Sequence, residues 1–360
     1  MSRRTLVISD TDLHGFSCGV NALKALRDSG VDADIYSHFS TNPSEPASTP
    51  SGLALLVQSL GEYDLYILDI PVDARNPRAY IDALVSHARH KGRVIWMDHH
   101  GHSPWVVEEL KKNGVLVAVY QTAYDIALAV PRMYRKSDSW YERWALLGAA
   151  ADFDESVKER VSAELEVAVA EYLDPVYKSR LVELARALGL EAYAEHIKVN
   201  GQPGWFARAV AEKGIEPEQV IEAARQIGKP LLVPRYSIAG DVVYTTELPP
   251  VGLAWKTAWK LCALTGAKVA VLPAYNPRAN QYSVIIARYW RADDSVTSAI
   301  EEYVGRKFGG RQVIGHPGAR SVPLVSQAEI DDIPAIAREL SDMLASKAHA
   351  QSRLASVSYA

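Results

Sequence analysis

The sequence contains only two cysteines, Cys18 and Cys262, among its 360 residues. Two thiols are too few for a disulfide framework, and they suit a reducing compartment. No apolar stretch approaches the roughly 20 residues that span a bilayer, and the apolar run after the first four residues is too short for a signal-peptide core. We therefore expect a soluble, cytoplasmic protein with no membrane partner.

An excess of positive charge is also missing. The chain has 39 Lys and Arg against 43 Asp and Glu, which gives a net charge of -4. This balance excludes a protein that coats nucleic acid by bulk charge, although a local basic groove remains open. The apolar fraction of 48% and the charged fraction of 23% are ordinary for a globular protein and exclude disorder as the main state.

The first 125 residues alternate between short β-rich runs and amphipathic helical patterns. Helical patterns cover 18–28, 79–89 and 104–112. The runs that we predict to be strands are 5–9, 33–37, 65–70, 93–97 and 115–120. This alternation predicts an α/β fold with a doubly wound, mostly parallel sheet.

The composition changes twice further along the chain. Glu, Ala, Leu, Arg and Lys dominate residues 139–228 at helical spacing, and a second, smaller α/β pattern begins near 230. We expect a first α/β domain over 1–154, a helical connector over 155–230, a smaller α/β domain over 231–345 and a flexible tail over 346–360.

Acidic residues and histidines follow the predicted strands in series. The clusters are Asp10-Thr11-Asp12-Leu13-His14-Gly15, Asp69, Asp98-His99-His100 and, after a helix, Asp152. Any one aspartate after a strand is commonly a helix cap or a turn residue. Together, however, these carboxylates share the edge of a parallel sheet where functional groups gather, and they would repel one another without cations. Carboxylates with imidazoles suit Mn²⁺, Fe²⁺, Zn²⁺ or Mg²⁺.

These motifs resemble the DHH phosphoesterase superfamily. Its members include RecJ-type exonucleases, nano-RNase/pAp phosphatases, cyclic-dinucleotide phosphodiesterases and manganese pyrophosphatases. The segment Gly309-Gly310, followed by Gly315-His316-Pro317-Gly318-Ala319, is similar to the GGHPxAAG signature of the DHH-associated C-terminal domain. That domain belongs to the nuclease and oligonucleotide branch, so the resemblance favours this branch over the pyrophosphatases. It covers nearly the whole chain and implies a catalytic domain over 1–154 and a substrate-binding domain over 231–345.

The resemblance implies a role for each residue of the clusters. Asp69 would bridge two divalent ions, most consistent with Mn²⁺, with Mg²⁺ or Fe²⁺ as alternatives. Asp10 and Asp12 would serve the first ion. The remaining roles are His14, His99 and Asp152 around the second ion, His100 against the scissile phosphate, and Asp98 as the residue that orients the two histidines.

Two departures from the family pattern bear on activity. The first motif reads Asp10-x-Asp12-x-His14-Gly15 where RecJ-like proteins have His-x-Asp-x-Asp-Gly. The exchange keeps the number of ligands, so we expect an active site with an altered metal preference; the alternative is a degenerate site. Arg320-Ser321 stands where the C-terminal signature has Ala-Gly, so Arg320 either narrows the site or clamps a phosphate.

The second domain carries the basic charge of the chain. Between residues 229 and 320 there are twelve Lys or Arg and six Asp or Glu. The resemblance and this excess predict a substrate-binding set of Gly309, Gly310, Arg311, Gly315, His316, Arg320 and Arg288. Trp255 and Trp259 could stack on bases, but their spacing favours the core side of a helix. His102 follows the DHH motif and could be a further site residue, but we favour a solvated loop position for it.

The sequence therefore predicts an Mn²⁺-dependent phosphodiesterase that cleaves single-stranded nucleic acid or short oligonucleotides by a two-metal mechanism. One alternative is a phosphatase or phosphodiesterase of small nucleotides such as pAp or a cyclic dinucleotide. The alternative of another class is a catalytically degenerate, RecJ-like scaffold of the replication machinery. A homodimer, or a replication or repair protein as partner, stays open.

Overall fold

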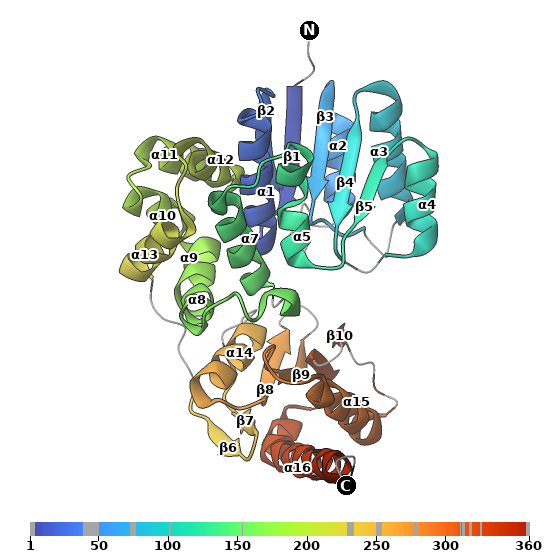
Figure 1. The fold of residues 1–360 in the computed structure, drawn as a ribbon, viewed down its shortest axis with the longest axis vertical. Helices are drawn as coiled ribbons and strands as arrows, with labels where there is room; N and C mark the ends of the chain where they lie inside the picture. The colour runs from blue at the N-terminus through green and yellow to red at the C-terminus, as the bar shows by residue number, and fades with distance from the viewer. Residues whose placement is uncertain are drawn as a thin grey trace. The chain divides into compact units, whose positions relative to one another are not determined.

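The computed structural model describes residues 4–38, 50–72, 77–100, 102–152, 154–228, 234–249, 254–276, 280–309, 311, 314–316, 319–324 and 326–357. The chain divides into two compact units, Met1–Lys229 and Pro230–Ala360. Both are α/β, as the sequence predicts, and each is described by itself (Figure 1).

The first unit is built on a five-stranded parallel sheet. Its strands are β1 (Arg4–Asp10), β2 (Ala33–His38), β3 (Tyr63–Leu68), β4 (Val94–Asp98) and β5 (Leu116–Val119). The order β2-β1-β3-β4-β5 confirms the doubly wound sheet, with the chain reversing its direction of winding between β1 and β3. At such a switch point the connections leave a crevice beyond the carboxyl ends of the strands.

Helices cover both faces of this sheet (Figure 1). On one face lie α2 (Pro50–Ser59), α3 (Pro77–His90) and α4 (Pro104–Lys112); on the other lie α1 (Leu13–Arg27), α5 (Ala123–Ala127), α6 (Ala129–Met133) and α7 (Ser139–Ala151). Neighbouring residues of β1 alternate between the two cores, Val7 with α1 and Ile8 with α2 and α3. Because both faces are buried, the middle residues of β1, β3 and β4 are apolar.

The helical segment after α7, for which we expect a helical connector over 155–230, packs into the core of the first unit. Leu173, Phe206 and Val210 are fully buried in the same core as Phe16 of α1. The apolar faces of these helices are buried against α1, and this burial holds the segment on the first unit. It contains a 3₁₀ helix (Glu155–Val157), α8 (Ala163–Ala168), a π-helical stretch (Val169–Leu173), α9 (Asp174–Ser179), α10 (Leu181–Ala187), α11 (Glu191–Asn200), α12 (Gly204–Lys213) and α13 (Pro217–Ile227).

The close approach of α1 and α7 depends on Gly148. A Cβ atom at this position would lie 2.8 Å from Ser17 Cβ and 3.3 Å from His14 Cδ2. We expect Gly148→Ala to lower the free energy of unfolding by about 1–3 kcal/mol, because the two helices must move apart. The matched control is Gly305→Ala in the helix Asp294–Phe308, where a Cβ would meet nothing within 4 Å. Chemical denaturation should show that variant to be slightly more stable; equal effects of the two substitutions would contradict the packing argument.

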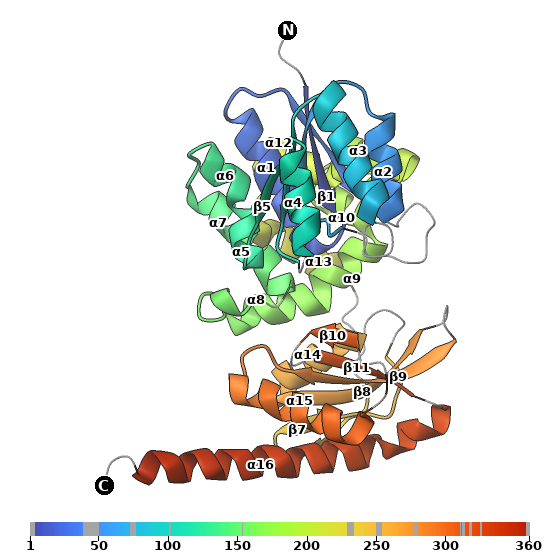
Figure 2. The same cartoon turned by 90° about the vertical axis from the view of Figure 1, so that its right-hand side faces the viewer.

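The second unit holds a six-stranded mixed sheet in the order β10-β11-β9-β8-β7-β6. Figure 2 shows the helix α14 (Ala254–Thr265) on one face and α15 (Asp294–Phe308) and α16 (Ile333–Val357) on the other. The strands are β6 (Ser237–Ala239), β7 (Val242–Tyr244), β8 (Val269–Asn276), β9 (Gln281–Arg288), β10 (Ile314–His316) and β11 (Ala319–Pro323), and a 3₁₀ helix covers Gln327–Asp332.

The C-terminal helix is longer than the sequence predicts. α16 continues to Val357, into the region 346–360 for which we expect a flexible tail. Leu340 and Leu344 anchor the helix on the sheet, and the Ala, Leu, Gln and Lys residues after them favour its continuation. Across the described ranges, no helix combines the length and the apolar character that a membrane span requires.

Candidate metal centre

The sheet brings most of the predicted ligands to one edge. Asp10 ends β1, Asp69 follows β3, Asp98 ends β4 and Asp152 caps the C-terminus of α7. Two groups of side chains have ligand atoms within 4.8 Å of one another: Asp69, Asp98, His99 and His100, and His14, His99 and Asp152. The second group is the set that the sequence analysis predicted around the second metal ion.

Asp69 lies at the centre of this cluster. Its Oδ2 is 2.9 Å from His14 Nδ1, and its Oδ1 is 3.1 Å from His99 Nε2 and 3.9 Å from His100 Nδ1. Only 2% of the side chain is exposed, and the backbone adopts a φ of +59°, which is strained for a residue other than glycine. One buried carboxylate surrounded by three imidazoles suits the predicted bridging role.

The contact between His14 and Asp69 requires a cation. His14 Nε2 lies 2.8 Å from the carbonyl oxygen of Ala123, which only accepts, so Nε2 must carry a hydrogen. A neutral His14 then presents the lone pair of Nδ1 to Asp69, and two acceptors face each other at 2.9 Å. A divalent ion between them, or a second proton on His14, removes this conflict.

Three buried ligand atoms support the metal interpretation. His14 Nδ1, Asp69 Oδ1 and His99 Nε2 are all buried and, apart from their contacts within this cluster, have no hydrogen-bond partner in the part of the chain that the structure describes. His99 Nε2 also lies 3.3 Å from Asp152 Oδ2, and the His14 and His99 rings meet edge to face at 4.9 Å. Because buried polar atoms are normally paired, these residues fit a bound cation.

The Asp98 carboxylate makes hydrogen bonds within the Asp98-His99-His100 segment. Its Oδ1 accepts from the backbone N–H groups of His99 at 2.8 Å and His100 at 3.3 Å, and from His100 Nδ1 at 2.7 Å. Asp98 thus holds the Nδ1–H of His100, which leaves Nε2 for contacts outside the DHH segment. Asp98 therefore orients the side chain of His100, as expected, but it contacts His99 only through the backbone.

Asp10 and Asp12 lie outside the two ligand groups found in the described chain. Asp12 caps α1 by accepting from the Gly15 N–H at 2.8 Å, and buried Asp10 accepts from the Thr11 N–H at 2.5 Å. Gly15 is required here, because a Cβ would lie 2.6 Å from the Asp10 carbonyl oxygen. The role of the two aspartates at a first metal ion stays a prediction.

His102 is misplaced by the sequence analysis, which expected a solvated loop residue. Its side chain is only 4% exposed, its Nε2 lies 3.0 Å from Asp98 Oδ2, and its ring lies 4.5 Å from the Trp96 ring. The available signal was the spacing of four residues from Asp98, which is not by itself distinctive.

The site shifts the pKa values of its own groups. Burial favours neutral Asp69, but His14 and His99 outweigh this effect and lower its pKa below the usual range. Burial lowers the pKa of His100, but the hydrogen bond that its Nδ1–H donates to Asp98 outweighs this effect and raises the value to about 9. The metal-free site thus retains protons on histidine, and metal binding should release protons.

Protonation of Asp152 should weaken metal binding at acidic pH. Burial, then the carboxylates of Asp12 and Asp69, raise its pKa to about 6 against an opposing effect of His14, although 34% of the side chain is exposed. Below that pH the carboxyl is protonated and must lose its proton to bind metal. We expect Asp152 to contribute a fall of up to about tenfold per pH unit in the apparent affinity for Mn²⁺ between pH 6 and 5, in addition to the fall caused by the histidines.

Calorimetric titration with Mn²⁺ at several pH values measures this slope. In Asp152→Asn the number of protons released on binding at pH 5 should fall by about one, while the histidine contribution persists. An unchanged proton release in the variant would contradict the role of Asp152.

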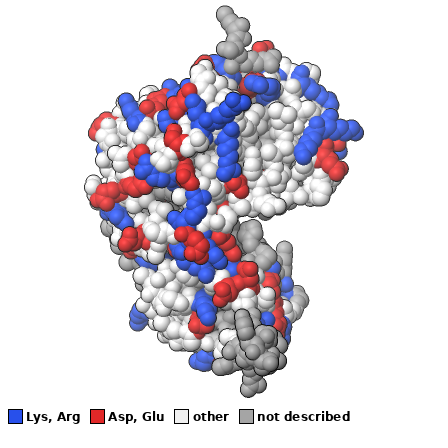
Figure 3. Space-filling view, viewed as in Figure 1, with Lys and Arg blue, Asp and Glu red and all other residues white. Residues whose placement is uncertain are grey.

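The predicted substrate-binding arginines of the second unit all contact acidic residues of that unit. Arg288 is 8% exposed and lies 3.3 Å from Asp294; the fork of Arg320 pairs with Glu301 at 2.8 and 2.6 Å; and Arg311 pairs with Glu329 at 2.8 Å. In Figure 3, basic and acidic side chains are interspersed over the face shown. The basic excess is therefore partly offset locally, and the substrate role of these residues stays a prediction.

The glycine-rich segment is described only in part. Gly309 ends α15, and Gly315 and His316 lie on β10, opposite Arg320 and Ala319 of β11. Gly310, Pro317 and Gly318 lie outside the described residues. Trp259 is buried and its ring lies 6.4 Å from that of Trp290, which favours the core interpretation of this tryptophan.

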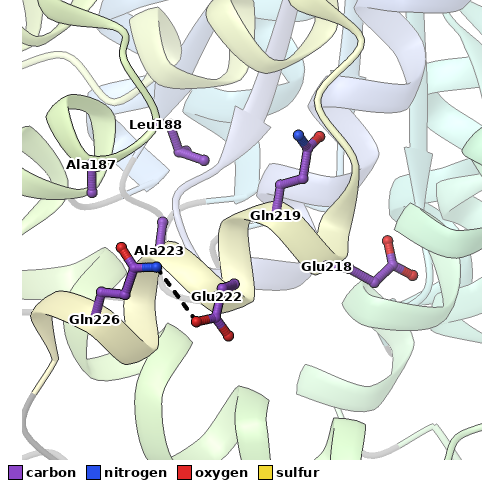
Figure 4. Close-up of a pocket in the computed structure, with 7 residues that line it drawn as sticks. All are labelled: Ala187, Leu188, Glu218, Gln219, Glu222, Ala223 and Gln226. Carbon is purple, nitrogen blue, oxygen red and sulfur yellow. Dashed lines mark hydrogen bonds between the residues drawn. The ribbon is translucent and has the colours of Figure 1, made fainter.

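A surface hollow elsewhere in the first unit has no histidine or aspartate among the described residues that line it. Figure 4 shows it between α10 and α13, where Gln226 donates to Glu222 at 3.4 Å. Its lining consists of Ala187, Leu188, Glu218, Gln219, Glu222, Ala223 and Gln226. We therefore place the candidate functional site at the sheet edge.

Comparison with known proteins gives likenesses of fold. No family model and no curated protein matches the chain. Among solved structures, it is similar to RecJ from Thermus thermophilus in complex with Mn²⁺ at 14% identity and a TM-score of 0.39, over 94% of this chain and 52% of RecJ. The chain thus spans about half the length of that RecJ.

Two further structures match more of their own length. The pGpG-specific phosphodiesterase PggH from Vibrio cholerae matches at 13% identity and a TM-score of 0.48, over 96% of this chain and 99% of PggH. The DHH domain of a member of the s1p family of ribosomal proteins matches at 14% identity and a TM-score of 0.49, over 94% and 87%. All three matches lie below 15% identity and below a TM-score of 0.5, so they assign no activity to this chain.

Proposed function

We propose that this chain is a DHH-type phosphoesterase that depends on two divalent metal ions, most consistent with Mn²⁺. The observation that carries the proposal is the buried Asp69 carboxylate, which faces His14 and His99 through atoms that make no other hydrogen bond in the described chain. A buried carboxylate in contact with two imidazoles is a typical ligand set for divalent transition-metal ions such as Mn²⁺, Fe²⁺ or Zn²⁺.

The residues of the site have separable tasks in this proposal. Asp69, His14, His99 and Asp152 hold the cations, with Asp10 and Asp12 beside them. When bound, the cations supply Lewis acidity and a nucleophile at neutral pH. His100, fixed by Asp98 and 32% exposed, is accessible to substrate and contacts the scissile phosphate through Nε2.

We place single-stranded nucleic acid or short oligonucleotides first as substrates, because the motifs of the second unit resemble those of the nuclease and oligonucleotide branch. A small nucleotide such as pAp or a cyclic dinucleotide is the second candidate. The ion pairs of Arg288, Arg311 and Arg320 favour it, since a long polyanion must compete with Asp294, Glu329 and Glu301 for these cations.

Turnover of a labelled series separates these substrates. Oligonucleotides of two to about twenty nucleotides, pAp and a cyclic dinucleotide are each incubated with the protein and Mn²⁺, with Asp69→Asn as the inactive control. Rates that hold or rise with length support the oligonucleotide substrate, and rates confined to dinucleotides or pAp support the small nucleotide. Folded protein that cleaves none of them would overturn the proposal.

Metal content separates the enzyme from a degenerate scaffold. Asp12, Asp69, Asp98, His99, His100 and Asp152 are all present, whereas a site that no longer turns over would be expected to lose several of them. Protein purified without chelator should contain two metal equivalents if it is an enzyme. Absence of metal, and no uptake of Mn²⁺ on titration, would favour the scaffold.

A further inference from the structure

Asp98 is contacted by histidines on both of its carboxylate oxygens. The residue is completely buried, and its Oδ1 receives His100 Nδ1 at 2.7 Å. On the other side, Oδ2 lies 3.0 Å from Nε2 of His102, whose side chain is 4% exposed. Within the described chain, neither Asp98 Oδ2 nor His102 Nε2 makes a hydrogen bond to any other group.

The ring of His102 is held by the same scaffold that shapes the metal centre. It packs edge to face on Trp96 at 4.5 Å, and the Trp96 indole N–H donates to the Ile70 carbonyl at 3.0 Å. Ile70 directly follows Asp69, whose backbone has the positive φ. Trp96 thus connects the turn that carries Asp69 with the residue that faces Asp98.

We propose that His102 is a positioning residue that fixes the carboxylate of Asp98 and, through it, the ring of His100. The inference rests on the proposed phosphoesterase function. A buried carboxylate is held in one orientation when both oxygens have a partner, and His100 takes its ring orientation from Oδ1 alone. Without a partner at Oδ2, Asp98 loses a fixed rotation and His100 loses its fixed position at the substrate.

The test compares three substitutions at His102 with a matched histidine elsewhere. His102→Gln keeps a nitrogen donor near the position of Nε2, His102→Asn is polar but too short to reach Asp98, and His102→Leu removes the donor. The control is His87→Leu: His87 is 1% exposed, and its Nε2 lies 2.8 Å from Tyr63 O, at the opposite edge of the sheet. This control shows what loss of a buried histidine does to stability alone.

We expect His102→Leu and His102→Asn to lower kcat by about tenfold to a hundredfold with little change in KM, because the substrate still binds while His100 is poorly placed. His102→Gln should restore most of kcat. His87→Leu should lower thermal stability while leaving kcat unchanged.

A second readout does not depend on turnover. In metal-free protein held above the His100 pKa of about 9, where the ring is neutral, ¹⁵N chemical shifts of the His100 ring should report a single Nδ1–H tautomer in the wild type and in His102→Gln, and a tautomer mixture in His102→Asn and His102→Leu. If His102→Leu fails to fold, the Gln and Asn variants carry the comparison.

Two results would overturn the positioning role: wild-type kcat in His102→Asn, or equal loss in His102→Gln and His102→Asn with an unchanged His100 tautomer. Failure of the proposed function looks different. In that case the wild type cleaves no substrate, and the ring shifts alone decide whether His102 fixes His100.

Discussion

Replacing Asp69 with asparagine should lower turnover by about a thousandfold or more and abolish tight binding of Mn²⁺. Asp69 lies within 3.1 Å of nitrogen atoms of both His14 and His99, so it is the carboxylate best placed to share an ion with either histidine. An amide offers one acceptor and no negative charge, and it cannot bridge two cations.

Asparagine is also the substitution that leaves the fold intact. The backbone φ of +59° at Asp69 is tolerated by asparagine better than by most residues, and the side chain has nearly the same shape. Asp69→Ala should also lose activity, but it adds backbone strain to the loss of a ligand.

The measurements are turnover on the best substrate, calorimetric titration with Mn²⁺, and unfolding monitored by circular dichroism. A suitable control is Asp32→Asn, which makes the same chemical change at a residue that is 68% exposed and pairs with Arg4. Near wild-type turnover in Asp69→Asn would refute the metal assignment; loss of folded structure would instead assign Asp69 a structural role.

Replacing His14 with aspartate should change which metal the site prefers. His14 is the proposed nitrogen ligand at the position where RecJ-like proteins have a carboxylate, and its buried Nδ1 faces Asp69 at 2.9 Å. Imidazole favours the later transition metals, whereas carboxylate favours Mg²⁺ and Mn²⁺. We expect His14→Asp to raise the ratio of Mg²⁺ to Zn²⁺ affinity by about tenfold or more.

Competitive titration of the metal-free protein with Mg²⁺, Mn²⁺ and Zn²⁺ measures this ratio. The control is Cys18→Ala. The Cys18 thiol lies 3.4 Å from His14 Nε2, so this substitution changes the packing around the His14 ring without removing the imidazole. The double variant Asp10→His/His14→Asp restores the usual order of the first motif and should retain the shifted preference. An unchanged order of affinities in His14→Asp would show that His14 is not a ligand.

The sequence predicted the first sheet well because strand signals are local. Five apolar runs separated by helical patterns correspond to β1–β5, with ends within two residues, and both faces of the sheet are buried as such runs require. The same locality explains the errors. Helical periodicity in 155–228 cannot show that Phe206 packs on Phe16, at 5.4 Å between ring centroids, because that contact joins residues far apart in the sequence.

The site was predictable to the extent that its residues follow strands. Since the carboxyl ends of parallel strands share an edge, the sequence by itself determined that Asp69, Asp98, His99 and His100 would meet there. It did not determine which atoms face one another. Only the tertiary structure decided that His14 presents Nδ1 to Asp69, because the Ala123 carbonyl of α5 occupies Nε2.

The tertiary structure alone also decided the partners of the remaining polar residues. Arg320 lies against Glu301 and His102 against Asp98, and both partners are set by how elements pack rather than by motif spacing. The physical reason is the same in each case. Periodicity and motifs fix the element and the strand end on which a residue lies, whereas the orientation and charge state of a side chain depend on neighbours from other parts of the chain.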